Sequence, residues 1–207
     1  MTKARKTTAA MVAAMAMTVG GRASANDEPI AATDQREAII VVHVVNYAGL
    51  SRDVLDEAKT RVASVYAVIG VRTVWVDGQD TVKPRRDGPL HLTVMLLSRE
   101  MAQKKISAEG LSDHLLGQAH LPSGRAYIFC DRIATMPGAP TYFPIPLGDV
   151  IAHEVGHLVL RSNSHSRSGI MRVNADVHAI HLQSFDKTQA RSIRTMLMEP
   201  TARATGR

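Results

Sequence analysis

The sequence predicts an α+β fold: a twisted mixed β-sheet backed by one helix, then a helix with a histidine motif, then a C-terminal helix. Three observations support this prediction. Several short runs of Val, Ile and Leu in the first two thirds of the chain have the length and residue types of strands. Apolar residues recur at helical spacing in 51–69 and 184–198. Residues 149–160 form a mostly apolar stretch of helical length.

The first helix and the strands around it have the clearest signals. Residues 38–45 are rich in Ile and Val and predict a strand. Ser51 is placed to cap a helix that runs to residue 69, and Gly70 is placed to end it. The strand at 38–45 is expected to belong to the sheet on which this helix packs. Further strands are predicted at 71–76, 90–97 and 126–130.

The later segments are less regular. Residues 78–88 predict a polar turn, and 107–121 are compatible with a short helix and a loop. Four prolines make 133–146 a predicted loop. The helix at 149–160 follows directly, and the closing helix at 184–198 has Ser184 as its expected cap.

The first 25 residues predict a secretory signal peptide. A basic start is followed by a modestly apolar stretch at 9–19 and by an A-x-A cleavage site at 23–25, which predicts cleavage after Ala25. Residues 26–207, about 180 residues, are enough for one domain with a real core. The expected location is outside the cell or in the periplasm. No later segment approaches the roughly 20 apolar residues of a membrane span.

Charge and cysteine content exclude other classes of protein. The signal segment holds four cations and no acid, so a chain of net charge +6 leaves a mature chain of +2. This does not indicate a nucleic-acid partner, which would require a clustered basic face. Cys130 is the single cysteine, so no internal disulfide forms, and a buried inert thiol is expected. A monomer is expected.

A His-Glu-Val-Gly-His motif occupies residues 153–157 of the predicted helix. His153 and His157 are four residues apart, so they share a helix face, with Cβ atoms roughly 5–6 Å apart, and can bind one metal ion. Glu154 lies about 100° further round the helix, where it can contact a zinc-bound water without being a ligand. Zinc lowers the pKa of that water to about 7, and a carboxylate can accept its proton. The motif predicts a Zn²⁺ site with a general base; the alternative is a surface helix with solvated histidines.

A third ligand must come from outside the helix. One large group of zinc enzymes uses a glutamate on a later helix, but no glutamate lies between Glu154 and Glu199. His165 is therefore the best candidate. Met171 follows it by six residues.

The segment 153–171 resembles the metzincin metalloproteases, whose signature is HExxHxxGxxH followed by a methionine-containing turn. The His165-Ser166 pair before a methionine resembles the matrixin branch and its bacterial relatives. The resemblance implies a zincin-like catalytic domain over 26–207. It also implies that substrate lies extended along strand 126–130, if that strand is the sheet edge over the cleft. The implied site has His153, His157 and His165 as zinc ligands, Glu154 as the catalytic base and Met171 as the Met-turn residue beneath the metal.

The sequence departs from the metzincin signature after the second histidine. Leu160 stands where the signature has glycine, and Asn163 stands where it has the third histidine. His165 comes two residues later, which leaves room for a wider turn. Asn163 tolerates the left-handed conformation and can replace glycine at a helix end.

The predicted function is that of a secreted zinc endopeptidase. Two alternatives remain: a zinc hydrolase of a non-peptide amide, and a non-catalytic protein stabilised by zinc. A structural site needs no adjacent base and prefers a fourth protein ligand, and no fourth ligand is evident.

Several other residues have two interpretations. Tyr142 and Phe143 can line the cleft or pack in the core. His178 and His181 are interpreted as exposed loop histidines, and His43 as a packed strand residue. The last group is either solvated loop charge or a set of cations that attract acidic substrate groups; it consists of Arg161, Arg167 and Arg172.

Overall fold

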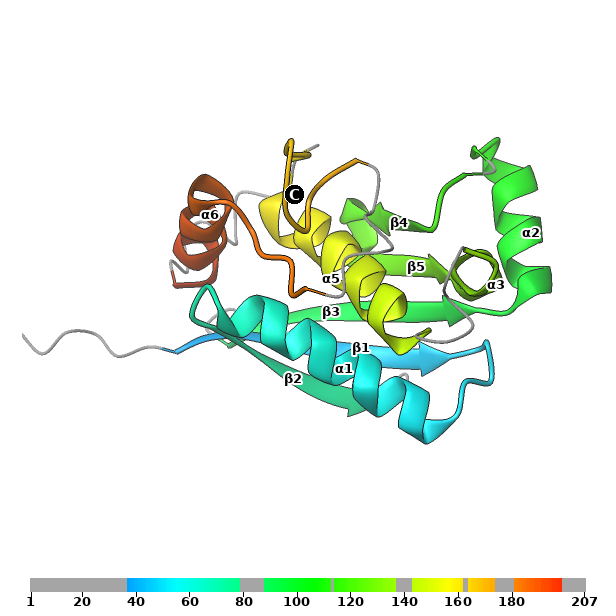
Figure 1. The fold of residues 1–207 in the computed structure, drawn as a ribbon, viewed down its shortest axis with the longest axis horizontal. Coiled ribbons are helices and arrows are strands. Elements are labelled where there is room, and N and C mark those ends of the chain that lie inside the picture. Colours follow the sequence, from blue (N-terminus) through cyan, green and yellow to red (C-terminus); the bar gives the residue numbers. More distant parts are fainter. Residues whose placement is uncertain are drawn as a thin grey trace, which may run out of the picture. The chain divides into compact units, whose positions relative to one another are not determined.

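A five-stranded sheet in the order β2-β1-β3-β5-β4 is the centre of the fold (Figure 1). Neighbouring strands pair in parallel except β4, which runs antiparallel to β5 at one edge. The strands are β1 (Ala38–Asn46), β2 (Val71–Asp77), β3 (Leu90–Leu97), β4 (Gly117–His120) and β5 (Arg125–Phe129). The computed structural model describes residues 37–78, 88–112, 114–136, 143–161, 164–173 and 181–198, all within the compact unit 36–207.

Helices lie on both sides of this sheet. Helix α1 and helix α5 pack on one face together with α6, and α2 packs on the other face (Figure 1). Among the described residues, no helix is long and apolar enough to cross a membrane. The helices are α1 (Arg52–Ala67), α2 (Arg99–Glu109), α3 (Cys130–Ala134), α5 (Pro144–Leu160) and α6 (Lys187–Met198), and a short 3₁₀ turn, η1, spans Leu121–Ser123.

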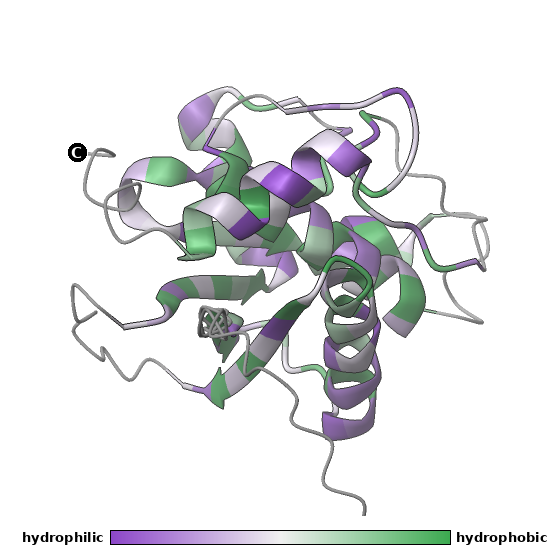
Figure 2. Cartoon of the chain, turned by 90° about the vertical axis from the view of Figure 1, so that its left-hand side faces the viewer, coloured by the Kyte–Doolittle hydropathy of each residue, from purple (hydrophilic) through white to green (hydrophobic). Residues whose placement is uncertain are grey.

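The alternation of side chains along each strand divides the core in two. Ile40, Val42 and Val44 of β1 point into the large core beneath α1 and α5. Leu97 and Phe129 point to the opposite face, where α2 covers them. Figure 2 shows hydrophobic segments gathered where the helices face the sheet.

Helix α1 is joined to α5 by polar contacts inside an apolar interface. Arg61 makes a bidentate pair with Asp149, with Nε–Oδ1 and Nη2–Oδ2 distances of 2.7 and 3.0 Å. Burial is the largest influence on Asp149 and raises the pKa of its carboxyl, against the lowering effect of Arg61. The Tyr66 hydroxyl donates to the carbonyl of Ala152, 3.2 Å away. These contacts fix the position of α5 against α1, and Asp149 also lines the cleft that contains His153 and His157.

The mixed sheet, the backing helix, the motif helix and the C-terminal helix are present as predicted. The sequence did not reveal α2, which begins at its cap Ser98 and ends at Gly110 in the left-handed conformation. It also did not reveal β4, whose four residues include glycine and two polar side chains. Strand β5 ends at Phe129, because Cys130 already begins α3.

Two predicted helix starts were wrong. Helix α5 begins at Pro144, inside the predicted loop, because proline is tolerated in the first turn, where its missing N–H has no helical partner. Helix α6 begins at Lys187 and not near Ser184. Asp186 and Gln189 exchange side-chain hydrogen bonds with each other's backbone N–H groups and form its cap.

Candidate metal centre

Three histidine side chains meet at one point beside α5. His153 and His157 come from successive turns of the helix, and His165 comes from the segment that follows it. The Nε2 atom of His157 lies 3.0 Å from Nε2 of His153 and 3.2 Å from Nε2 of His165. Within the described parts of the chain, this is the one group of three or more His, Cys, Asp or Glu side chains placed to hold a metal ion.

The spacing of these nitrogens suits a tetrahedral metal. Ligand nitrogens about 2.0–2.1 Å from a tetrahedral zinc ion lie about 3.4 Å apart, close to the two separations observed. Three imidazoles with one open position form a known donor set of catalytic zinc sites. All three histidines line one cleft, so the open position would face the cleft. Zn²⁺ is therefore a cofactor that these residues fit.

The chain leaves α5 through a residue in an unusual conformation. Arg161 follows the last helical residue with φ of 52°, in the left-handed region, and its N–H donates to the carbonyl of His157. The role predicted for Asn163 thus falls to Arg161, while Asn163 itself lies outside the described residues. The turn directly after Leu160 lets the chain come back along the helix, so that His165 reaches the other two histidines.

The segment that carries His165 is tied to two other parts of the fold. Ser164 accepts a hydrogen bond at its carbonyl from the Gln189 amide of α6, at 2.8 Å. The N–H of Ser166 donates to the carbonyl of Met171, at 2.9 Å. These bonds hold the backbone on both sides of an exposed imidazole.

A backbone carbonyl orients His153. Its Nδ1 lies 2.8 Å from the carbonyl oxygen of Ile170, so Nδ1 carries the proton and donates, which leaves Nε2 unprotonated for a metal. Burial, the largest influence, lowers the pKa of His153, and the contact with Ile170 opposes this shift. Ile170 was not among the predicted site residues, since a backbone carbonyl leaves no sequence signal.

Met171 lies beneath the helix that carries the histidines. Its side chain is fully buried, and a Cβ atom at Gly156 would lie 2.5 Å from its sulfur. The absence of a side chain at Gly156, inside the histidine motif, therefore lets Met171 pack against α5. The N–H of Ile170 donates to the carbonyl of Ser184 at 3.0 Å, which holds the preceding backbone.

Glu154 is buried beside the histidines and against β4. It is 7% exposed, and burial raises the pKa of its carboxyl to about 7, against a lowering backbone hydrogen bond from Ala119. Gly117 of β4 also packs against this side chain, since a Cβ atom there would lie 2.7 Å from Cγ of Glu154. The sequence prediction missed Gly117; a lone glycine after Leu115-Leu116 was the available signal.

A cleft of about 760 Å³ contains the histidines and Glu154. Strand β4 forms one wall, since Gly117, Gln118 and Ala119 line it. The predicted edge strand was wrong: β5 lies between β3 and β4, so β4 is the edge strand over the cleft.

Charged side chains of both signs line the cleft: Arg132, Arg172, Asp149 and Glu154. Arg172, for which the sequence left both interpretations open, lines the cleft, and so does Arg132, which the sequence analysis did not single out. Nη1 of Arg132 donates to the carbonyls of Ser112 and Leu115, so this side chain also holds the segment that leads into β4.

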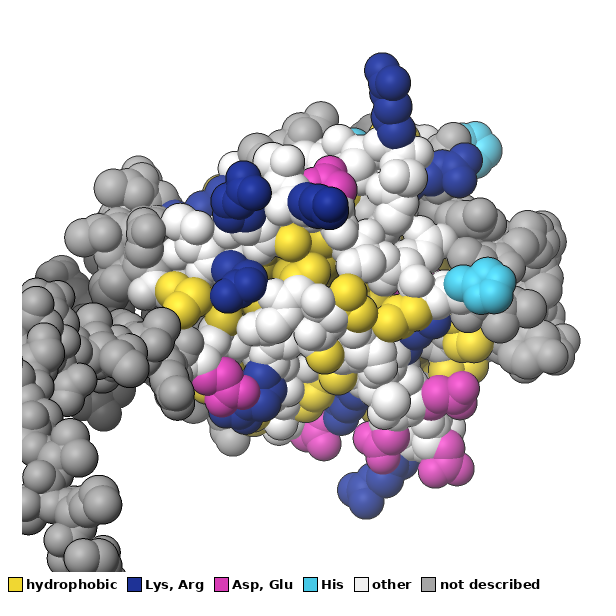
Figure 3. Space-filling model, turned by 60° about the vertical axis from the view of Figure 1, so that its left-hand side comes forward, with side chains coloured by type: hydrophobic (Ala, Val, Ile, Leu, Met, Phe, Trp, Pro, Cys, Tyr) yellow, Lys and Arg dark blue, Asp and Glu magenta, His cyan; other side chains and the backbone are white. Residues whose placement is uncertain are grey.

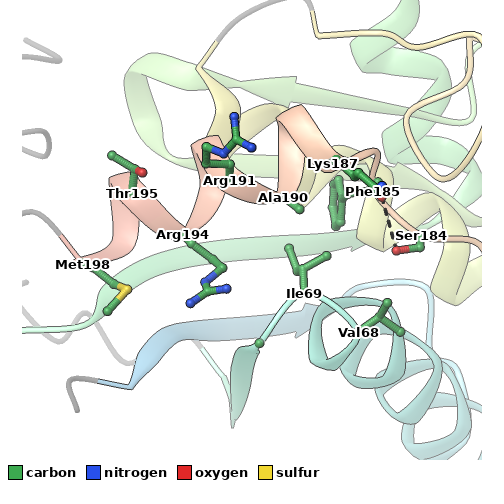
Figure 4. A pocket seen from close by; sticks show the side chains of 11 residues that line it. Val68, Ile69, Ser184, Phe185, Lys187, Ala190, Arg191, Arg194, Thr195 and Met198 are labelled. Carbon is green, nitrogen blue, oxygen red and sulfur yellow. Dashed lines mark hydrogen bonds between the residues drawn. The ribbon is translucent and has the colours of Figure 1, made fainter. Parts of the chain in front are cut away.

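A second cavity, of about 750 Å³, lies between α6 and the turn from α1 to β2 (Figure 4). Ser184 and Phe185 form part of its wall, and they also support the Met171 segment from behind. Figure 3 shows hydrophobic side chains among Lys and Arg side chains on one face of the molecule. The cations that line the cavity are Lys187, Arg191 and Arg194.

The remaining candidate residues lie apart from the histidine group. Cys130 is buried, and burial raises the pKa of its thiol to about 12, as expected for an inert thiol. His43 is buried in β1 with its Nε2 3.0 Å from Nδ1 of His91. His181 is exposed, and Phe143 packs against the large core. Tyr142 and His178 lie outside the described residues.

The solved structures to which this structure is similar include two at low sequence identity. The archaemetzincin from Methanopyrus kandleri aligns with a TM-score of 0.48 and 13% identity, over 79% of this chain and 97% of that chain. A zinc-dependent peptidase from Methanocorpusculum labreanum aligns with a TM-score of 0.42 and 16% identity, over 75% of this chain and 99% of that chain. The sequence matches no protein-family model and no curated protein.

Proposed function

We propose that this chain is a secreted zinc-dependent endopeptidase of the metzincin type. The observation that carries the proposal is the meeting of His153, His157 and His165 at one cleft, with buried Glu154 on the same wall. A structural zinc site would not need a buried carboxyl group beside its ligands.

In the proposed reaction, the three histidines bind the metal and Glu154 transfers the proton. Zinc, when bound, acts as a Lewis acid on a carbonyl oxygen and lowers the pKa of water to about 7. The imidazoles of His153, His157 and His165 would hold the ion and leave one position open to the cleft. Glu154 accepts the proton of the attacking water on its carboxylate and delivers it to the leaving amine. Glu154 is 7% exposed and packs against Gly117 of β4, so little bulk water reaches this carboxylate.

Strand β4 supports a peptide as the substrate. One side of β4 pairs with β5, and the other side borders the cleft that holds the histidines. An extended peptide can add to such an edge through main-chain hydrogen bonds. This observation favours a peptide over a small non-peptide amide, because a small amide has no extended main chain to form hydrogen bonds with a strand edge.

Export remains part of the proposal. The basic start, the apolar stretch and the A-x-A site of the first 25 residues support a signal peptide with cleavage after Ala25. Secreted protein should begin at or near Asn26, and N-terminal sequencing of extracytoplasmic protein checks this. An intact Met1 on that protein would contradict it.

The function is tested with purified mature protein and a peptide library read by mass spectrometry. We expect about one zinc ion per chain, internal cleavage of peptides, loss of cleavage with a chelator and recovery with added zinc. The matched control is His181→Ala, an exposed histidine outside the group, which should cleave like the parent. A zinc-loaded protein that cleaves no peptide would contradict the proposal, and so would cleavage unaffected by complete zinc removal.

A further inference from the structure

Gly117 and Glu154 are packed more closely than any side chain at position 117 would allow. A Cβ atom built on Gly117 would lie 2.7 Å from Cγ, 2.8 Å from Oε1 and 3.0 Å from Cδ of Glu154. Ordinary contact between such atoms needs about 3.5–4.0 Å. A methyl group at this position would therefore occupy space now taken by the carboxyl group.

The backbone of β4 is poorly placed to move away. Gly117 pairs with Ile128 of β5, and the N–H of Phe129 donates to the carbonyl of Leu116 at 2.9 Å. On the other side, Glu154 belongs to the middle of α5, whose backbone is fixed by the core. The part that can give way is the Glu154 side chain itself.

We infer that Gly117 is a positioning residue for Glu154: its missing side chain lets β4 close against α5 and hold the Glu154 carboxyl at the metal-binding face. The inference rests on the proposed function for its kinetic consequence and on packing alone for its structural one. The backbone hydrogen bond from Ala119, two residues further along β4, belongs to the same arrangement. Gly117 leaves space for the Glu154 side chain, and the backbone of Ala119 donates a hydrogen bond to its carboxyl group.

The expected effect of Gly117→Ala falls on turnover. A displacement of about 1 Å in a catalytic group can lower the rate about 100-fold. We expect kcat to fall about 10- to 100-fold and KM to change less than about threefold, because the cleft walls remain. Zinc content should equal that of the parent, because the three atoms nearest to a Cβ at position 117 all belong to Glu154 and none to a histidine.

Two further variants separate positioning from stability. Gly110→Ala is the matched control: its Cβ would meet nothing within 4 Å, but its φ of 61° makes alanine strained there. It should lower stability and leave kcat unchanged. Glu154→Asp shortens the side chain by one methylene. In that variant, Gly117→Ala should lower kcat by a much smaller factor than it does in the parent, because the shorter aspartate side chain leaves room for the added methyl group.

The deciding experiment is a pair of crystal structures of the zinc-loaded parent and Gly117→Ala, with their kcat and zinc content. The inference predicts a Glu154 carboxyl displaced from its position in the parent, with all three histidines in place. It is overturned if the carboxyl stays in place or if kcat changes less than twofold. If the parent itself cleaves no peptide, the proposed function fails, and the two structures still decide whether Gly117 positions Glu154.

Discussion

His153 is oriented by Ile170: its Nδ1 donates to the Ile170 carbonyl across 2.8 Å, while its Nε2 points to the other two histidines. Ile170 immediately precedes Met171, and its own N–H is held by the Ser184 carbonyl. The segment under the helix therefore acts as a support for a proposed ligand. Disturbing this segment should affect metal affinity before it affects the rest of the fold.

Met171→Leu conserves side-chain volume at a fully buried position. We expect a loss of less than about 1.5 kcal/mol in unfolding free energy, with zinc retained. Met171→Ala should cost about 2–5 kcal/mol because it leaves a cavity under α5. Urea unfolding and metal analysis check both variants. Complete loss of zinc in Met171→Leu would mean that the sulfur is a ligand, against the role proposed here.

Arg61→Ala should be strongly destabilising. It leaves Asp149 as an uncompensated charge in the α1–α5 interface, where both side chains are nearly buried, and such a loss costs about 3–5 kcal/mol. The double variant Arg61→Leu with Asp149→Leu removes both charges and should be less destabilised than Arg61→Ala alone. Denaturant unfolding measures each variant, and a double variant less stable than the single one would show that the pair itself is stabilising.

The burial of Glu154 should make the metal-free protein less stable as pH rises. The folded pKa of about 7 lies above the ordinary 4.5, so the folded state binds the proton more tightly than the unfolded state. The stabilisation is complete below 4.5 and is lost as pH rises through about 7, by about 3 kcal/mol in total. Glu154→Gln, which stays neutral, should lack this loss.

Urea unfolding of chelator-treated parent and Glu154→Gln protein across this pH range measures the difference. The stability of the glutamine variant relative to the parent should increase with pH and level off above about 7. A constant difference across the range would show that the carboxyl is not perturbed.

His165→Ala should bind zinc far more weakly than the parent and lose activity, because two imidazoles remain. Asn163→Ala should keep the metal, as should His178→Ala and His181→Ala. Isothermal titration with zinc compares the four variants. If His165→Ala binds zinc as tightly as the parent while His178→Ala or His181→Ala does not, a later segment closes the site and the metzincin proposal fails.

The sequence was most informative where spacing alone decides geometry. His153 and His157 share a helix face by their separation of four, and His165 was found because no later glutamate precedes residue 199. The contacts around them were beyond prediction. The contact to His153 comes from the backbone carbonyl of Ile170, which leaves no signal in the sequence. Arg161 adopts a left-handed φ because the chain must turn back towards the histidines after α5. Tertiary context, and not local preference, decided these features.

Strand β4 shows the same limit in the sheet. Its four residues carry too little pattern to predict a strand, and they become one because β5 offers a pairing edge. The strand expected to border the substrate if it formed the sheet edge is β5, which lies one strand inside that edge. The position of Gly117 against Glu154 depends on that pairing, so it too became visible only in the structure.

The most direct test of the central proposal compares the parent with Glu154→Gln for zinc content and peptide hydrolysis. Glu154 is placed beside the three histidines and is not one of the grouped donors. The variant should bind zinc near one ion per chain and lose turnover by several orders of magnitude, about 10³-fold or more. A glutamine variant with the turnover of the parent would contradict Glu154 as the general base, and loss of zinc would contradict the three-histidine site.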